Sequence, residues 1–137
     1  MKYVFALVVA LLLNATANLL MKVGMKPIEA SGGVLKDGVP GAVKAVLTSG
    51  TLVVGLSCFA LNAAFYMYAL QSRALKISLA YPVMVGGGFA LIALVAHWHP
   101  TLAERLTWTQ SIGVALVLAG VMLIAVQTGT PDPRIDG

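Results

Sequence analysis

Polar side chains interrupt three long apolar stretches of this sequence at helical spacing. Asn14 and Asn18 lie four residues apart, and Asn62 and Tyr66 repeat that interval farther along the chain. Residues four apart share one face of an α-helix, so each pair would present two hydrogen-bonding groups together. Tyr81 lies in a third apolar stretch. Amides and phenols are uncharged at neutral pH, so the expected chemistry is recognition of a polar group and not proton transfer.

The elements that must position these residues are four apolar windows without a charged side chain. They cover residues 3–21, 51–70, 77–96 and 108–126. About 20 residues of helix cross the roughly 30 Å of hydrocarbon in a bilayer. The sequence therefore predicts an all-α integral membrane four-helix bundle in one domain, residues 1–128, followed by a disordered tail, residues 129–137.

The composition agrees with a membrane protein. Of the 137 residues, 59% are hydrophobic and 10% are charged, and the mean hydropathy is +0.91. The net charge of +4 is spread over the connections and forms no basic stripe, so we expect contact with anionic lipid and not with nucleic acid. Cys58 is the single cysteine and cannot form an intrachain disulfide.

Two segments leave alternatives open. Lys2, the apolar run after it and Ala15-Thr16-Ala17 also fit a cleaved secretory signal, although we expect a retained span. In the connection 22–50, the segment Pro40–Ser49 is either a disordered loop or a short helix in the membrane interface. As a helix, it would place Val39, Val43, Val46 and Leu47 on one face and Lys44 off it.

Basic residues do not determine the orientation of the chain. With four spans, Lys2, Arg73, Lys76 and Arg134 fall on one side of the membrane, and the five other basic residues fall on the opposite side. The positive-inside rule requires an imbalance to select a topology. Either the chain inserts in both directions, or a determinant other than charge sets its direction.

A polar side chain in hydrocarbon is costly unless it has a partner or faces a cavity. One hypothesis is that the asparagines hydrogen-bond between helices and contribute about 0.6 to 2 kcal/mol each. The other is that Asn14 and Asn62, together with polar residues of the third window, line a substrate pathway. For the whole set, which lies on three helices at compatible depths, we favour a polar cavity.

Glycine spacing predicts helix contacts. Gly113 and Gly120 are two turns apart and would face one neighbouring helix, in this chain or in a second copy, and we favour a second copy. Gly86-Gly87-Gly88 permits close packing, a kink, or both.

His97 and His99 have no evident third ligand, so we expect no metal and no cofactor. No nucleophile–base pair is present, so catalysis is not expected.

The chain resembles the small multidrug resistance family and the wider drug/metabolite transporter superfamily. The resemblance rests on Leu20-Met21-Lys22, on Ala80-Tyr81 followed by Gly86 and Gly88, and on Gly113-Val114 repeated as Gly120-Val121. Small multidrug exporters have a glutamate in the first helix and a tryptophan in the third, and the matching positions here are Asn14 and Met84. Because asparagine does not titrate, proton-coupled export is not expected.

Within that superfamily the chain is nearest to the four-helix subunits of aminoarabinose-type undecaprenyl-glycolipid flippases, which also lack the glutamate. This resemblance implies a bacterial inner-membrane transporter that works as a homodimer or heterodimer and moves an amphiphile between leaflets. It implies a substrate site of Asn14, Asn18, Asn62, Tyr66, Tyr81 and Met84, and head-group contacts from Lys22, Arg73, Lys76 and Arg105. The alternatives are an exporter of drug-like or small organic solutes and a non-transporting accessory subunit.

Overall fold

The computed structural model describes residues 1–34, 36–72, 76–98 and 107–127, and all regular structure within them is helical. The helices are α1 (Lys2–Ala30), α2 (Gly38–Thr48), α3 (Gly50–Ala69), α4 (Ile77–Trp98) and α5 (Trp108–Gln127). Four of them, α1, α3, α4 and α5, are long and apolar enough to cross a membrane. This confirms the predicted all-α membrane fold. The predicted tail lies outside the described residues, as do Arg73, His99 and Arg105.

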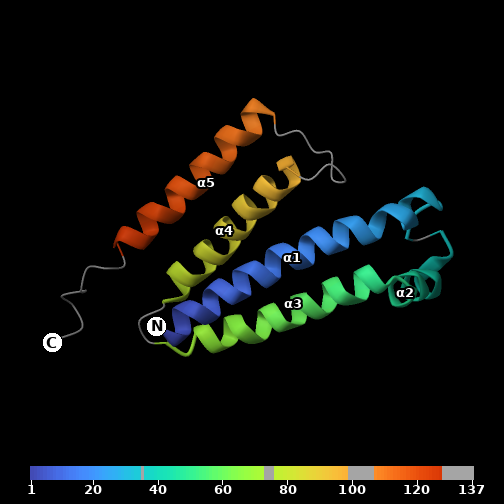
Figure 1. The fold of residues 1–137 in the computed structure, drawn as a ribbon, viewed down its shortest axis with the longest axis horizontal. Coiled ribbons are helices and arrows are strands. Elements are labelled where there is room, and N and C mark those ends of the chain that lie inside the picture. The colour runs from blue at the N-terminus through green and yellow to red at the C-terminus, as the bar shows by residue number, and fades with distance from the viewer. Residues whose placement is uncertain (35, 73–75, 99–106, 128–137) are drawn as a thin grey trace.

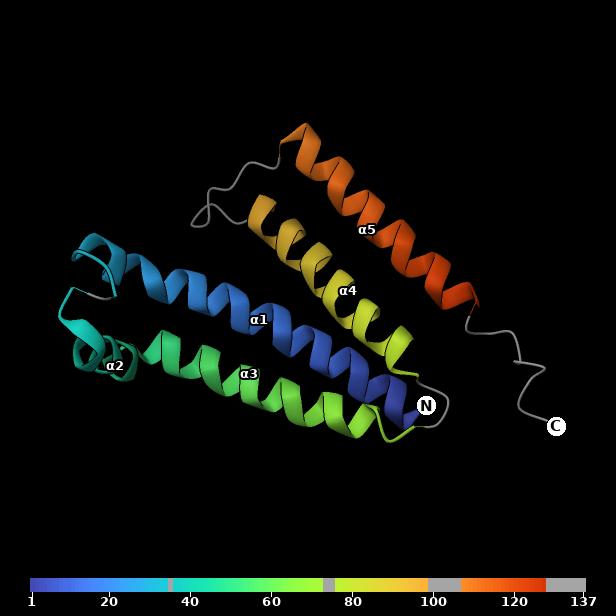
Figure 2. The same ribbon diagram turned by 180° about the vertical axis from the view of Figure 1, so that it is seen from behind.

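The long helices form a row in the order α3, α1, α4, α5 (Figures 1 and 2). Helix α1 packs against both α3 and α4, and α5 packs against α4. Neighbours α1 and α3 are antiparallel, and so are α4 and α5 (Figure 1). The start of α1, the end of α3, the start of α4 and the end of α5 therefore lie toward one side of the row.

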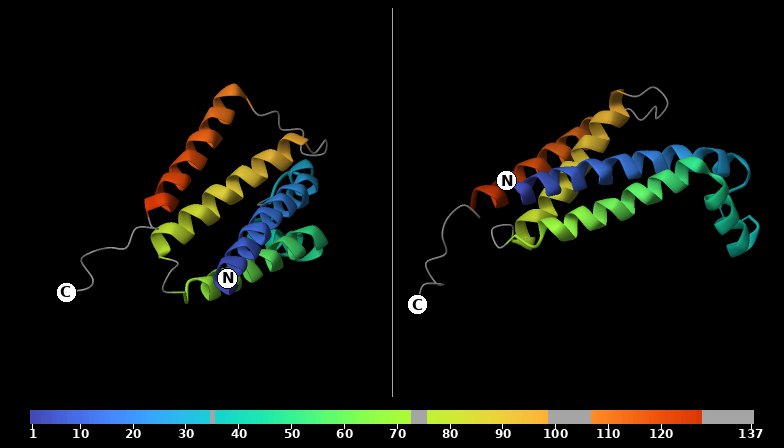
Figure 3. Two further views of the ribbon diagram at one scale, coloured as in Figure 1. Left: turned by 60° about the vertical axis from the view of Figure 1, so that its left-hand side comes forward. Right: turned by 60° about the horizontal axis from the view of Figure 1, so that its bottom comes forward.

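Small residues bring α1 and α3 close together. On α1, the buried residues Ala10, Ala17 and Gly24 recur every seven positions, and Gly55, Asn62 and Ala69 do so on α3. A seven-residue repeat keeps one stripe of a helix against its neighbour, and small side chains let the backbones approach. The Ala17 carbonyl oxygen lies 3.3 Å from the position that a Cβ on Gly55 would occupy. Figure 3 shows helices α1 and α3 running side by side.

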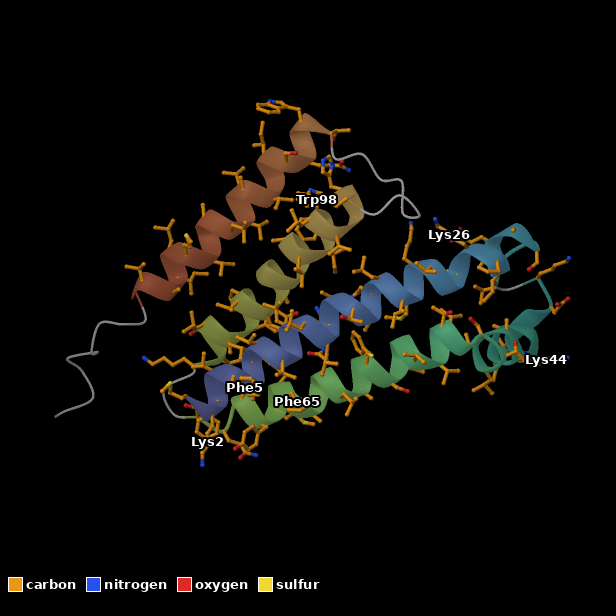
Figure 4. All side chains as sticks on the ribbon, in the orientation of Figure 1. Lys2, Phe5, Lys26, Lys44, Phe65 and Trp98 are labelled. Carbon is orange, nitrogen blue, oxygen red and sulfur yellow. The ribbon has the colours of Figure 1, made fainter. Side chains whose placement is uncertain are left out.

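Glycines also make the contacts of α4. A Cβ added to Gly86 would lie 2.6 Å from Val121 Cγ2 of α5, and one added to Gly88 would lie 3.0 Å from Asn14 Nδ2 of α1. These glycines therefore face opposite neighbours of α4 in the row. The outward faces of the helices carry large exposed side chains such as Phe5 and Phe65 (Figure 4), which suit contact with lipid.

Helix α1 continues beyond the span expected at residues 3–21. Its 29 residues measure about 43 Å, which exceeds the hydrocarbon thickness, so its last turns reach the head-group region or beyond. The connection that follows contains α2, which turns away from the axis of α3 (Figure 3). The helical alternative for this segment is thus correct. Val39, Val43 and Leu47 are exposed on α2, and its position in the membrane interface stays a prediction.

Replacing Gly55 with leucine tests the contact between α1 and α3. The new side chain would meet the Ala17 carbonyl and the side chains of Leu20 and Met21, so we expect a loss of about 1–3 kcal/mol of unfolding free energy. Gly50→Leu is the matched control, because a Cβ there meets no described atom within 4 Å. Unfolding of the detergent-solubilised protein in SDS would measure both. Equal stability of the two variants would contradict the close packing.

Candidate functional site

Three helices meet near the N-terminal end of α1. The cluster at this junction consists of buried side chains from α1, α3 and α4, namely Ala6, Leu7, Ala69, Ala80 and Met84. Tyr66 of α3 packs against this cluster. The small side chains in it allow three backbones to converge, which brings residues from distant parts of the sequence together. Tyr66 and Met84, both predicted site residues, meet here.

Asn62 lies one turn before Tyr66 on α3 and is only 5% exposed. Gly55 lies against Ala17, Leu20 and Met21 of α1, so the antiparallel seven-residue repeat places Asn62 against the turn of α1 that begins at Ala10 and reaches Asn14. Ala10 offers no side-chain hydrogen bond. Among the described residues, the Asn62 Oδ1 atom and the Tyr66 hydroxyl are buried side-chain polar groups without a hydrogen-bond partner. Each such group costs about 1–3 kcal/mol, so their burial needs an explanation beyond packing.

The asparagines of α1 are in a different situation. Asn18 is exposed, and its Nδ2 donates to the Asn14 backbone oxygen at 2.8 Å and approaches the Asn14 Oδ1 at 3.5 Å. Asn14 is partly buried beside Gly88, on the side of α1 that faces α4. Asn62 approaches α1 from the side that faces α3. A single cavity shared by Asn14 and Asn62 therefore stays a prediction.

The two predicted site residues of α4, Tyr81 and Met84, differ in burial. Met84 is buried at 9% exposure, whereas Tyr81 is 56% exposed. Tyr81 directly follows Ala80, a member of the buried cluster against which Tyr66 packs. The structure thus brings Tyr66 to the cluster that contains Met84, with Asn62 one turn before Tyr66 and Tyr81 next to Ala80. This arrangement can bind a polar group by hydrogen bonds beside apolar surface.

The predicted head-group residues are divided between the two ends of the row. Lys22 and Lys76 are both exposed, and Lys76 immediately precedes α4, at the end where α1 begins. Figure 4 shows Lys2 at that end and Lys26 and Lys44 at the other. The 20 residues from Lys2 to Lys22 rise about 30 Å along α1, so one phosphate cannot contact both ends at once.

Gly113 and Gly120, the predicted interface residues, are on α5. Cβ atoms added to Gly113 or Gly120 would meet no described atom within 4 Å, and α5 instead contacts α4 through Val117 and Val121. The contact of these glycines with a second copy stays a prediction. In the described part of the chain, no three His, Cys, Asp or Glu side chains are grouped to hold a metal.

The sequence interpretation missed Ala10 as a residue of the turn that lies against Asn62. The signal was available, because Ala10, Ala17 and Gly24 are spaced every seven residues, as are Gly55, Asn62 and Ala69. Pairing the two repeats needs the helix order and register, which the structure supplies. Ala10 is fully buried, and Asn62 is 5% exposed.

Removing an unpartnered polar group should stabilise the protein. Tyr66→Phe deletes the buried hydroxyl, and we expect the unfolding free energy to rise by about 1–3 kcal/mol in SDS titrations. Asn62→Ala, which keeps a small side chain in the α3 stripe, should act in the same direction. Tyr68→Phe is the matched control, because Tyr68 is 43% exposed, and it should change stability by less than about 0.5 kcal/mol. A loss of stability in Tyr66→Phe would mean that the hydroxyl has a partner.

Several proteins are similar to this chain. The uncharacterized protein y4nH of Sinorhizobium fredii is 33% identical over 112 residues, which cover 82% of this chain and 85% of that protein. A protein of Shewanella sediminis named as a probable 4-amino-4-deoxy-L-arabinose-phosphoundecaprenol flippase subunit, ArnF, is 36% identical over 70 residues, or 51% of this chain and 46% of that protein. The probable ArnF of Aeromonas salmonicida is 29% identical over 118 residues, or 86% of this chain and 75% of that protein. No family model and no solved structure gives a significant match.

Proposed function

The chain belongs to the same protein family as y4nH of Sinorhizobium fredii, and we propose that it is a flippase subunit that moves a polyprenyl-phosphate-linked sugar between membrane leaflets. The observation that carries the proposal is the similarity to proteins named as ArnF flippase subunits, which extends over 118 residues in one case. The chain is a multi-pass membrane protein with four apolar helices. A transporter in a bacterial inner membrane fits both observations, and membership of the drug/metabolite transporter superfamily is part of the proposal.

The distribution of charge supports this function. Basic residues lie at both ends of the helix row, and residues 3–21, 51–70, 77–96 and 108–126 contain none. A phosphate is attracted to lysines at a membrane surface, where each contributes about 1 kcal/mol. The polar groups of Asn62 and Tyr66 lie between the two ends, within the apolar part of the protein. The phosphate is thus received at either surface, and the head group has hydrogen-bonding groups along its path.

Translocation in reconstituted vesicles tests the function. A short-chain polyprenyl phosphate that carries a sugar is placed in both leaflets, and an impermeant periodate reagent then oxidises the exposed sugar. Empty vesicles should protect the inner half, whereas vesicles with the protein should lose that protection. Lys76→Gln should slow the loss about fivefold, because it removes about 1 kcal/mol of attraction at the membrane surface. Lys76→Arg, which keeps the positive charge at the same position, is the control.

Binding provides a second measurement that does not depend on a partner subunit. A photoreactive polyprenyl phosphate should label the purified protein, and excess unlabelled lipid should reduce that labelling. The proposal is rejected if the protein neither accelerates translocation nor is labelled specifically.

We propose that the subunit works as a pair, with itself or with a similar four-helix protein, through α5. No described residue of α5 is buried, and large apolar side chains such as Leu116, Met122 and Leu123 are exposed on it. Gly113 and Gly120 leave room for a close approach on this helix. The word subunit in the names of the ArnF proteins also supports an assembly of more than one chain.

Leucines at Gly113 and Gly120 should weaken self-association. The substitutions do not disturb a described contact within the chain, so the monomer should keep its fold. We expect the dissociation constant of the dimer, measured by cross-linking and light scattering, to rise at least about tenfold, because small-to-large changes block helix contacts. Ala115→Leu, at an exposed position of α5, is the matched control. Unchanged association of the double variant would exclude this face as the interface.

A further inference from the structure

Two buried polar atoms on α3 are available for a ligand. The Asn62 Oδ1 atom accepts hydrogen bonds, and the Tyr66 hydroxyl both donates and accepts them. Neither has a partner among the described residues, although Asn62 is 5% exposed. In contrast, Asn14 and Asn18 interact with each other along α1. If all the asparagines served only as packing contacts, a partner would be expected for the Asn62 Oδ1 atom, and none is present among the described residues.

The surroundings of these two atoms contain no formal charge. Tyr66 packs against the apolar cluster that includes Leu7 and Met84. No Asp, Glu, Lys or Arg occurs in residues 3–21, 51–70, 77–96 or 108–126. A cation that enters such a site loses its hydration and finds no carboxylate to replace it. A hydroxyl group loses much less and can hydrogen-bond to both atoms.

We propose that Asn62 and Tyr66 form a binding site for an uncharged, hydroxyl-bearing sugar, so that the lipid head group carried by this protein is neutral and not an amino sugar. The inference rests on the proposed flippase function and specifies its substrate class. It separates this chain from the ArnF proteins, whose names specify a 4-amino-4-deoxy-arabinose. A hydroxyl of the sugar donates to Asn62 Oδ1, and a second hydrogen bond joins the sugar and the Tyr66 phenol.

Direct binding of matched lipids tests the proposal. Four short-chain polyprenyl phosphates are compared on the purified protein in detergent: one with a neutral hexose, one with aminoarabinose, one with N-acetylated aminoarabinose and one without a sugar. At pH 7 the neutral hexose should bind at least about tenfold more tightly than the protonated amino sugar. Acetylation removes the charge and should restore most of the affinity.

Substitutions of Asn62 and Tyr66 test whether these two residues cause the preference for a neutral sugar. Tyr66→Phe and Asn62→Ala should each reduce the affinity for the neutral lipid about five- to tenfold, and circular dichroism and SDS unfolding would show that the fold is kept. Tyr68→Phe should bind like the unmodified protein. Asn62→Asp places a carboxylate in the site and should reverse the preference in favour of the amino sugar.

The outcomes separate the two proposals. Equal or tighter binding of the amino sugar overturns the neutral head group while leaving the flippase function in place. Unchanged affinities in both Tyr66→Phe and Asn62→Ala also overturn it and assign the two atoms to bound water or packing. If none of the four lipids binds, the flippase proposal fails, and the head-group inference fails with it.

Discussion

The close approach of α1 and α3 is the contact on which the rest of the structure depends. Its stripes of alanine and glycine repeat every seven residues, so the two backbones remain adjacent along most of the length of α3. Lipid and protein are equally apolar, and helices in a bilayer therefore associate through close packing more than through the hydrophobic effect. Large residues in these stripes would separate the pair and move α4 away from Leu7 and Leu11, which it contacts on α1.

The same stripe explains why two polar atoms are buried without partners. Asn62 occupies a position in the α3 stripe where the repeat otherwise has Gly55 and Ala69. A small apolar residue there would pack equally well against Ala10 and would avoid the cost of desolvation. Proteins that keep an unpartnered polar group at the expense of stability often do so at a functional site. Tyr66 fits that description because it packs at the junction of three helices, and Asn62 lies one turn before it on α3.

The long helices also differ in their packing neighbours and in how many of their residues are buried. Helix α1 has neighbours on both sides, whereas α5 contacts α4 alone among the described helices and has no buried residue. The Val117 and Val121 side chains pack on Gly86, and the rest of α5 remains open to lipid or to another chain. An assembly through α5 would cover this face without changing the packing of α1 against α3.

The sequence by itself determined the membrane class and the positions of the spans. The exclusion of charge from four windows of helical length has one physical reason, the cost of a charge in hydrocarbon, and that reason does not depend on how the helices pack. It also predicted that Asn62 and Tyr66 share a face, because helical periodicity is local. It left the segment of α2 undecided between helix and loop, since its short amphipathic pattern fits both.

Only the tertiary structure decided which polar residues are satisfied. Asn14, Asn18 and Asn62 are the same residue type in similar apolar contexts, yet Asn18 donates to Asn14, whereas the Asn62 Oδ1 atom has no partner among the described residues. The bond from Asn18 is local to α1, but what lies opposite Asn62 depends on the register between α1 and α3, in which Ala17 contacts Gly55. Hydrogen-bond satisfaction depends on what lies opposite a side chain, and that information is not contained in the spacing of residues along one helix.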